Sequence, residues 1–181
     1  MDEASDRQLV ARTRGGEADA FGELVRRYQT SVYNVCYRLL GDRAEAEDQS
    51  QEAFLRAYRR LGSYDDQRPF GPWMRRVAAN LCLNALQRRR AAMPLDEELE
   101  EVPGEASDLP EPSSDRREEI ERVRRALLRL PAHYRAVIEL RHYQGMSYDE
   151  IAGALGIDPG DVRTRLFRAR RRMADWLRAD G

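Results

Sequence analysis

Apolar residues recur along this chain at spacings of three and four, which is the period of an α-helix. No stretch alternates apolar and polar residues in the way that predicts a half-buried strand. Before residue 90 the pattern predicts four helices, separated by glycine-containing breaks. They cover about 6–14, 17–40 and 42–61, and a fourth begins near 69–72 and runs to 90.

The periodicity disappears from residue 91 to residue 115 and then returns. The aperiodic stretch is rich in Ala, Glu, Asp, Ser and Pro, which predicts a flexible acidic linker. After it, four more helices are expected over 117–129, 131–144, 147–155 and 159–178. The predicted fold class is therefore all-α, with two small helical domains over 1–90 and 116–181. A fully extended linker could reach ~80 Å, about two turns of B-DNA at ~34–36 Å each.

Charge is divided sharply among these three segments. Residues 1–90 carry a net charge of +3, residues 91–115 carry −9, and residues 116–181 carry +5, although the whole chain carries only −1. All 31 basic residues are arginine, whose planar guanidinium suits phosphates and base edges. The two helical blocks therefore retain a charge compatible with nucleic-acid binding.

The sequence contains too few ligand residues to favour a metal or redox site. Two histidines and two cysteines are scattered along it, and Cys36 and Cys82 lie within apolar helical patterns. We therefore expect buried, reduced thiols and no cofactor. The acidic start lacks a signal-peptide core, and no apolar run is long enough to cross a bilayer. A cytoplasmic protein without membrane insertion is expected.

Residues 146–177 have the local signals of a helix-turn-helix. Ser147 and Glu150 form a predicted capping box, and Gly156 suits a left-handed helix end. Small Ala152, then Gly156, then Val162 allow two helices to approach closely and turn sharply. The second helix would then enter a DNA major groove.

Polar and basic residues crowd the outer side of that second helix. We call the following set the basic face: Arg163, Thr164, Arg165, Phe167, Arg168 and Arg171. Arginines near the start of such a helix can contact guanine, and later ones can contact phosphate. Alone, this run would indicate an ordinary solvated face, but the capping residues and helix-turn-helix spacing favour DNA binding.

The third predicted helix carries a second surface of interest. Asp48, Gln51, Glu52 and Leu55 share one side of it, and we call this set the acidic face. An acidic and polar patch with one exposed leucine is typical of a protein-binding surface. An ordinary solvated face is the alternative, and spacing alone would favour it.

The fourth predicted helix carries Arg76, Asn80, Leu83 and Gln87 opposite its core side, with Arg75 beside them. We call these five residues the polar stripe of residues 75–87. Three aromatic residues, Tyr64, Phe70 and Trp73, lie at the adjoining loop. Arginines and aromatic rings together suit single-stranded nucleic acid. The alternative is that the rings seal the helix end, and for Trp73 we favour it.

Together these motifs resemble the bacterial extracytoplasmic-function (ECF) RNA polymerase sigma factors over nearly the whole chain outside the linker. The order and spacing of the motifs are more specific than any one of them. In the N-terminal block the resemblance rests on DAFGELV (19–25) with Tyr28, AEDQSQEAF (46–54) and the segment from FGPWM (70–74) to Asn80. In the C-terminal block it rests on LPAHYR (130–135), YDEIA (148–152) and VRTRLFRAR (162–170). Gln49 and Asp161 depart from the family pattern.

The resemblance implies a function and partners. The chain would bind core RNA polymerase through the acidic face and direct stress-responsive transcription initiation, without enzymatic chemistry. The basic face would read duplex −35 promoter DNA. The loop from 62 to 69 would help hold an unpaired −10 base, and the −10 contacts would come from Tyr64, Phe70, Arg75, Arg76 and Asn80. Because such factors are often held by an anti-sigma protein, this is a further candidate partner.

Two other classes of protein are compatible with a helix-turn-helix. A free-standing repressor or activator would need an effector or dimerisation domain, whereas residues 1–90 carry the acidic face and the polar stripe of residues 75–87. A symmetric footprint on a palindrome would support it. An enzyme with a DNA-binding tail would need a catalytic constellation, and the sequence offers no metal-ligand cluster, nucleophile triad or phosphate-binding glycine loop.

Overall fold

The computed structural model describes residues 4–92 and 114–179, and within these ranges every regular element is helical. The expected all-α fold is confirmed, while most of the expected linker lies outside the described residues. The helices are α1 (Asp6–Arg14), α2 (Ala18–Leu40), α3 (Arg43–Arg60), α4 (Phe70–Ala92), α5 (Ser114–Leu128), α6 (Ala132–Ile138), α7 (Tyr148–Leu155) and α8 (Pro159–Ala179). A short 3-10 turn, η1 (Leu61–Ser63), follows α3, and a π-helical turn, η2 (Glu139–Tyr143), follows α6.

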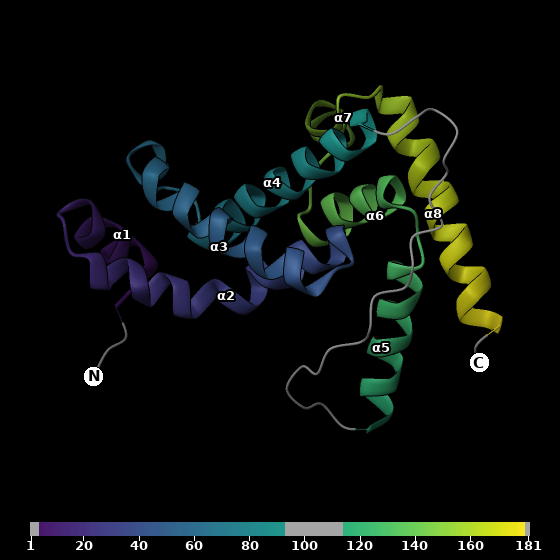
Figure 1. The fold of residues 1–181 in the computed structure, drawn as a ribbon, viewed down its shortest axis with the longest axis horizontal. Coiled ribbons are helices and arrows are strands. Elements are labelled where there is room, and N and C mark those ends of the chain that lie inside the picture. The colour runs from purple at the N-terminus through teal and green to yellow at the C-terminus, as the bar shows by residue number, and fades with distance from the viewer. Residues whose placement is uncertain (1–3, 93–113, 180–181) are drawn as a thin grey trace.

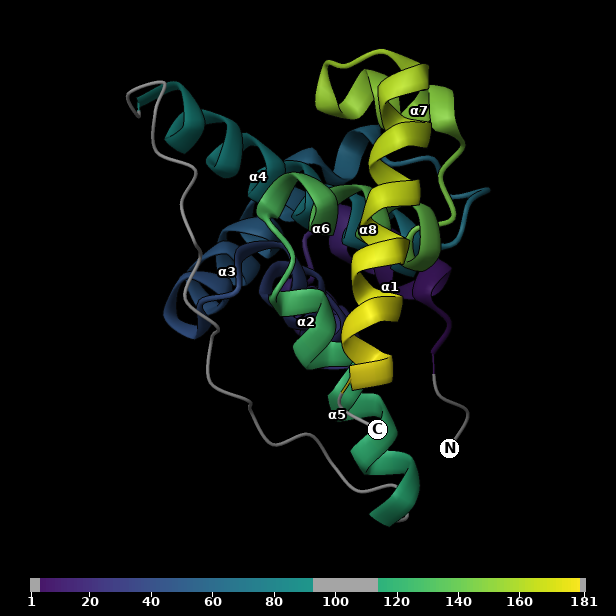
Figure 2. The same cartoon turned by 90° about the vertical axis from the view of Figure 1, so that its right-hand side faces the viewer.

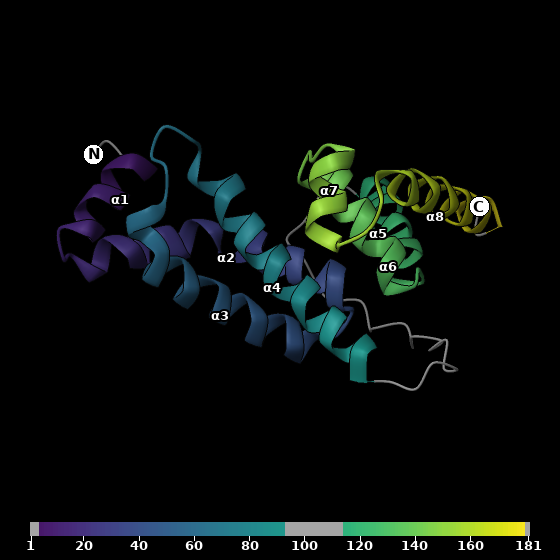
Figure 3. The ribbon, with the colours of Figure 1, turned by 90° about the horizontal axis from the view of Figure 1, so that it is seen from above.

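The helices form two blocks that lie side by side. In the first block α2 packs against α1, α3 and α4; in the second, α8 packs against α5, α6 and α7. α1 and α8 lie at opposite ends of the molecule (Figures 1 and 3). Viewed from the second block, α8 runs along the outside with α7 at one end and α5 near the other (Figure 2).

Helix boundaries follow the local signals in the sequence. Gly41 ends α2 with a φ of 79°, and Gly156 ends α7 with a φ of 64°, a left-handed conformation that glycine adopts at little cost. The side chain of Asp42 caps α3 by accepting a hydrogen bond from the Glu45 amide at 2.8 Å. These predicted ends are confirmed.

The predicted helix over 131–144 differs from the structure in one respect. Its second half is the π-helical turn η2, in which the Gln144 amide donates to the Glu139 carbonyl at 3.1 Å. Every residue from Tyr134 to Leu140 is buried, in α6 as well as in the π-helical turn. A regular amphipathic helix, which the periodicity predicted, buries one face only, whereas this segment packs against both α8 and α2.

The two blocks also contact each other, which the sequence did not predict. α2 contacts α6 and η2, and the buried apolar residues of both blocks form one continuous cluster. Arg135 on α6 lies at this contact and is 2% exposed. Its guanidinium donates to the carbonyls of Leu39 at 3.1 Å and Leu40 at 3.4 Å, at the end of α2.

Arg135 completes hydrogen bonds that helix ends otherwise lack. It also donates to the carbonyls of Leu128 at 3.0 Å and Leu130 at 2.9 Å, where α5 ends. The last carbonyls of a helix have no partner within the helix, and they carry the negative end of its dipole. One buried cation therefore joins the C-terminal ends of two helices from different blocks.

Candidate functional site

The helix-turn-helix is formed by α7 and α8, and its capping interactions are those expected. The Ser147 hydroxyl accepts a hydrogen bond from the Glu150 amide at 3.2 Å, and the Glu150 carboxylate accepts one from the Ser147 amide at 2.8 Å. Hydrogen bonds to the Glu150 carboxylate from the backbone and the side chain of Ser147, together with a smaller contribution from Arg76, hold the pKa of Glu150 below its usual range. Asp158 caps α8 by accepting from the Gly160 amide at 2.7 Å.

α8 has one buried side and one exposed side. Val162, Leu166 and Ala169 are at most 1% exposed and pack inward. Of the basic face, Arg165 is half-buried and the other five residues are exposed, with Phe167 64% exposed. The core side and the outer side of α8 therefore lie where the apolar spacing predicted.

The four arginines of the basic face are not engaged by other side chains of the described residues. No ion pair joins Arg163, Arg165, Arg168 or Arg171 to a carboxylate within residues 4–92 and 114–179. The neighbouring Arg170 instead contacts His142 at 3.1 Å. A row of guanidinium groups without neighbouring carboxylates gives this face of α8 a positive charge, as expected of a surface that binds an anionic polymer.

The acidic face lies on the exposed side of α3. Asp48 and Gln51 are exposed, Glu52 is half-buried, and Leu55 is 52% exposed. Glu52 makes a long ion pair with Arg59, at 3.9 Å. α2 and α3 line an open hollow of about 360 Å³, and Gln51 is one of its lining residues. An exposed leucine among carboxylates beside a hollow is suited to a partner that offers both apolar and basic side chains.

The polar stripe of residues 75–87 lies on α4 and is called the α4 stripe from here on. It is only partly exposed, and two of its exposed residues contact α7 of the other block. Asn80 is exposed, and Arg75 is half-buried. The Arg76 guanidinium lies 3.8 Å from the Glu150 carboxylate, and the Gln87 side chain donates to the Leu155 carbonyl at 3.4 Å. Leu83 lies between them on the same side of the helix and is 3% exposed, although the sequence placed it away from the core.

The aromatic residues beside the α4 stripe pack against one another. Phe70 is 1% exposed and Tyr64 is 6% exposed, and their rings meet edge to face with centroids 5.6 Å apart. The half-buried Trp73 lies against both rings. In this conformation the rings of Tyr64 and Phe70 are unavailable to stack on a base, and they instead form the buried side of the loop from 62 to 69.

Sequence reasoning did not find the charged residues that join distant elements. The sequence pattern places Arg135 and Glu139 only within a helix, and Arg14 only at the end of one. Arg14 donates to the Leu61 carbonyl at 2.9 Å, beside the loop from 62 to 69. Charged residues inside an otherwise apolar helix, such as Arg135 and Glu139, are a signal that could have indicated buried charges with partners on other elements.

In the described part of the chain, no three His, Cys, Asp or Glu residues are grouped so as to hold a metal ion. No helix among the described residues is long and apolar enough to cross a bilayer. Cys36 and Cys82 are buried free thiols, as predicted. A hydrogen bond with Cys36, followed by burial, raises the pKa of Cys82 far above its usual value.

Known proteins match both blocks. Residues 24–92 match the family described as sigma-70 region 2, and residues 120–173 match sigma-70, region 4. The ECF RNA polymerase sigma factor SigW of Bacillus subtilis is 34% identical over 180 residues, covering 95% of this chain and 96% of its own. The RNA polymerase sigma-H factor of Pseudomonas aeruginosa is 35% identical over 178 residues, with 94% and 92% covered.

Solved structures show the same fold. A structure of CnrH in complex with the cytosolic domain of CnrY is 30% identical, covers 97% of this chain and 99% of that chain, and superposes with a TM-score of 0.58. The sigma factor RpoE from Bartonella quintana, in complex with the anti-sigma factor NepR, shares the fold at 21% identity with a TM-score of 0.60. Sequence, fold and the two family matches agree, and the chain belongs to the ECF RNA polymerase sigma factors, which are transcription initiation factors rather than enzymes.

Proposed function

We propose that this chain brings core RNA polymerase to promoters in the cytoplasm by binding promoter DNA at two separate elements. The basic face on α8 reads the −35 element as duplex, and the α4 stripe with the loop from 62 to 69 reads an unpaired −10 base. The observation that carries the proposal is the row of arginines on the basic face, which have no carboxylate partner among the described residues and lie on a capped helix-turn-helix.

At the −35 element the first turns of α8 would lie in the major groove. Arg163 lies near the start of the helix, where an arginine fork can donate to O6 and N7 of guanine. The exposed ring of Phe167 suits contact with a thymine methyl group. Arg171, two turns further along, is placed to bind the phosphate backbone. Asp161 is exposed in the first turn, so its charge disfavours a phosphate close to the helix start.

At the −10 element Asn80 and Arg75 would contact a base taken out of the duplex, and Tyr64 and Phe70 would support the loop beneath it. Capturing an unpaired base offsets part of the cost of strand separation, a few kcal/mol per base. Arg76 and Gln87 contact α7 in this structure, so those contacts must break before the whole α4 stripe can reach DNA. The two blocks would therefore move apart on promoter binding.

Core polymerase would bind at the acidic face, where Asp48, Gln51 and Glu52 surround the exposed Leu55. The partner surface that complements it is basic with an apolar centre. An anti-sigma protein is a second proposed partner, because the similar proteins CnrH and RpoE were solved with the cytosolic domain of CnrY and with the anti-sigma factor NepR.

The polymerase part of this proposal is tested by substitutions in the acidic face. Asp48→Ala and Glu52→Ala should each weaken binding of the full chain to purified core polymerase, because each removes a charge from the contact. Duplex −35 DNA binding should not change, since these residues lie on α3 and the basic face lies on α8. Asp175→Ala removes an exposed carboxylate at the far end of α8 and serves as a matched control. Wild-type core affinity in both acidic-face variants would contradict the assignment.

A further inference from the structure

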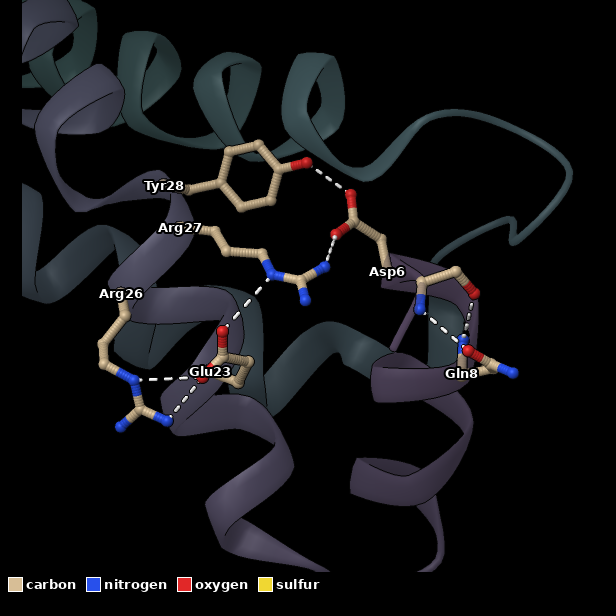
Figure 4. Close-up of polar contacts among 7 residues, drawn as sticks. Asp6, Gln8, Glu23, Arg26, Arg27 and Tyr28 are labelled. Carbon is tan, nitrogen blue, oxygen red and sulfur yellow. Dashed lines mark hydrogen bonds and ion pairs between the residues drawn. The ribbon is translucent and has the colours of Figure 1, made fainter. Parts of the chain in front are cut away.

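The first helix, α1, is held firmly against α2 at its own N-terminus. Ser5 and Gln8 form a capping box that starts the helix. The Asp6 carboxylate accepts hydrogen bonds from the Tyr28 hydroxyl and from Arg27, the latter at 3.1 Å, and both donors lie on α2 (Figure 4). Burial, with the Asp6 interaction second, raises the pKa of Tyr28 to about 12, so this hydroxyl stays a donor at neutral pH.

At the other end of α1, Arg14 reaches the segment that connects α3 to α4. Its guanidinium donates to the Leu61 carbonyl from Nη2 at 2.9 Å and from Nε at 3.2 Å. Nη2 also donates to the Tyr64 carbonyl, and Nη1 lies 3.7 Å from the Asp66 carboxylate. One side chain, 47 to 52 positions away in sequence, therefore contacts this segment at three residues.

The same segment is fixed on its buried side by Tyr64. The Tyr64 ring packs against Phe70 and Trp73, and its hydroxyl donates to the Arg68 carbonyl. The outer side of the loop is left free for a ligand, since Ser63, Asp65, Gln67 and Arg68 are exposed. Arg14 therefore binds the backbone where the loop starts, and the Tyr64 hydroxyl binds it near the end of the loop, at Arg68.

We propose that Arg14 is a positioning residue for −10 recognition, acting through the loop from 62 to 69. This rests on the proposed reading of a −10 base by that loop. A loop that is ordered before binding loses less conformational entropy when the base enters, which raises its affinity. Such a loop also cannot rearrange to accommodate a different base, whereas flexible loop surfaces do so and bind promiscuously, and order therefore raises selectivity. Arginine suits the task because its planar fork donates to several acceptors at once, whereas a lysine ammonium is a single point charge.

The test measures transcription by the full chain with core polymerase on promoters that differ only in the −10 sequence. Arg14→Ala should reduce the ratio of transcription between a preferred and a substituted −10 element by on the order of fivefold to tenfold. Core affinity and −35 binding should remain those of the wild type. Arg14→Lys should recover part of the discrimination, because it can still donate to one carbonyl.

Two further variants separate the possible outcomes. Arg12→Ala, on the same helix, removes an exposed arginine that pairs with Glu17 and should leave discrimination unchanged. Gln67→Ala alters the exposed side of the loop and should reduce discrimination. If Gln67→Ala does so while Arg14→Ala keeps the wild-type ratio, the role of Arg14 is wrong and the proposed function stands. If the wild type shows no −10 preference at all, the proposed −10 function is wrong and the role of Arg14 falls with it.

Discussion

The guanidinium of Arg38 and the carboxylate of Glu139 lie 2.6 Å apart across the contact between the two helical blocks, and the Glu139 side chain is fully buried. Gln144 donates a further hydrogen bond to Glu139 at 2.9 Å, and Arg38 also lies over the Tyr143 ring at 4.1 Å. Burying a carboxylate is costly unless it is paired and hydrogen-bonded. The contact between the blocks thus contains a buried carboxylate, Glu139, whose burial depends on its pairing with Arg38.

Arg38→Ala should destabilise the protein far more than the loss of an ordinary surface pair. It leaves Glu139 in the interface without its cation, and breaking a buried pair in this way costs about 3–5 kcal/mol. Separation of the blocks would expose Glu139 to water and relieve the cost of its burial. Part of the lost stability should therefore appear as opening of the contact between α2 and α6, without unfolding of the whole chain. Urea unfolding measures the first effect, and amide hydrogen exchange in α6 measures the second.

The matched comparison for that variant is Arg12→Ala, which removes an arginine paired with Glu17 where both side chains are at least half exposed. Exposed pairs contribute about 0–1 kcal/mol. Equal stability losses for Arg38→Ala and Arg12→Ala would show that the Arg38–Glu139 pair does not stabilise the contact between the blocks.

Arg163→Ala and Arg171→Ala should weaken binding to −35 duplex DNA in different ways. Arg163 lies near the start of α8, so its loss should cost about 1–3 kcal/mol and relax the preference at one base pair. Arg171 is expected to bind phosphate, so its loss should weaken binding to all sequences alike. It should also reduce the slope of the logarithm of the binding constant against the logarithm of the salt concentration by about one in magnitude. Titrations against a panel of single-base variants at several salt concentrations distinguish the two.

The control for these titrations is Arg178→Ala, at the far end of α8, where the guanidinium pairs with Asp175 at 3.3 Å. It should bind every duplex as the wild type does. A uniform loss across the panel for Arg163→Ala would contradict base reading by that residue.

Local features of the fold were predictable because the residues that determine them are adjacent in sequence. Gly41 and Gly156 end helices through their own backbone conformation, and Ser147 caps a helix three residues from Glu150. The exposed Leu55 and the buried side of α8 likewise follow from helical period alone. Each of these was expected, and each is found.

Features that depend on distant contacts were not predictable in this way. Periodicity gave Leu83 an outward position on α4, but Leu83 is 3% exposed, and α7 of the other block contacts Arg76 and Gln87 on the same side of the helix. Arg14 and Arg135 act on carbonyl groups that lie 47 and 96 positions away. Carbonyl acceptors have no sequence signature, so only the three-dimensional structure shows which residues bind them.

Cys82 should resist alkylation in the folded protein. Its pKa is raised by the hydrogen bond with Cys36 and by burial, so the reactive thiolate does not form at ordinary pH. The unfolded chain releases this proton near pH ~8.5. Since the folded state keeps the proton that the unfolded state loses, this group should lower stability as the pH rises above that value.

Mass spectrometry after iodoacetamide treatment at pH 9 measures this directly, with and without urea. The expected result is labelling of Cys82 only in urea. Labelling at the same rate in the folded protein would contradict its burial between α2 and α4.

The claim that this chain directs promoter-specific initiation is tested most directly by run-off transcription. Purified core polymerase is incubated with promoter fragments from the source genome, with and without the full chain. We expect discrete transcripts only when the chain is present, and we expect their loss when either the −35 or the −10 element is substituted. No transcript from any fragment, together with failure of the chain to co-purify with core polymerase, would contradict it.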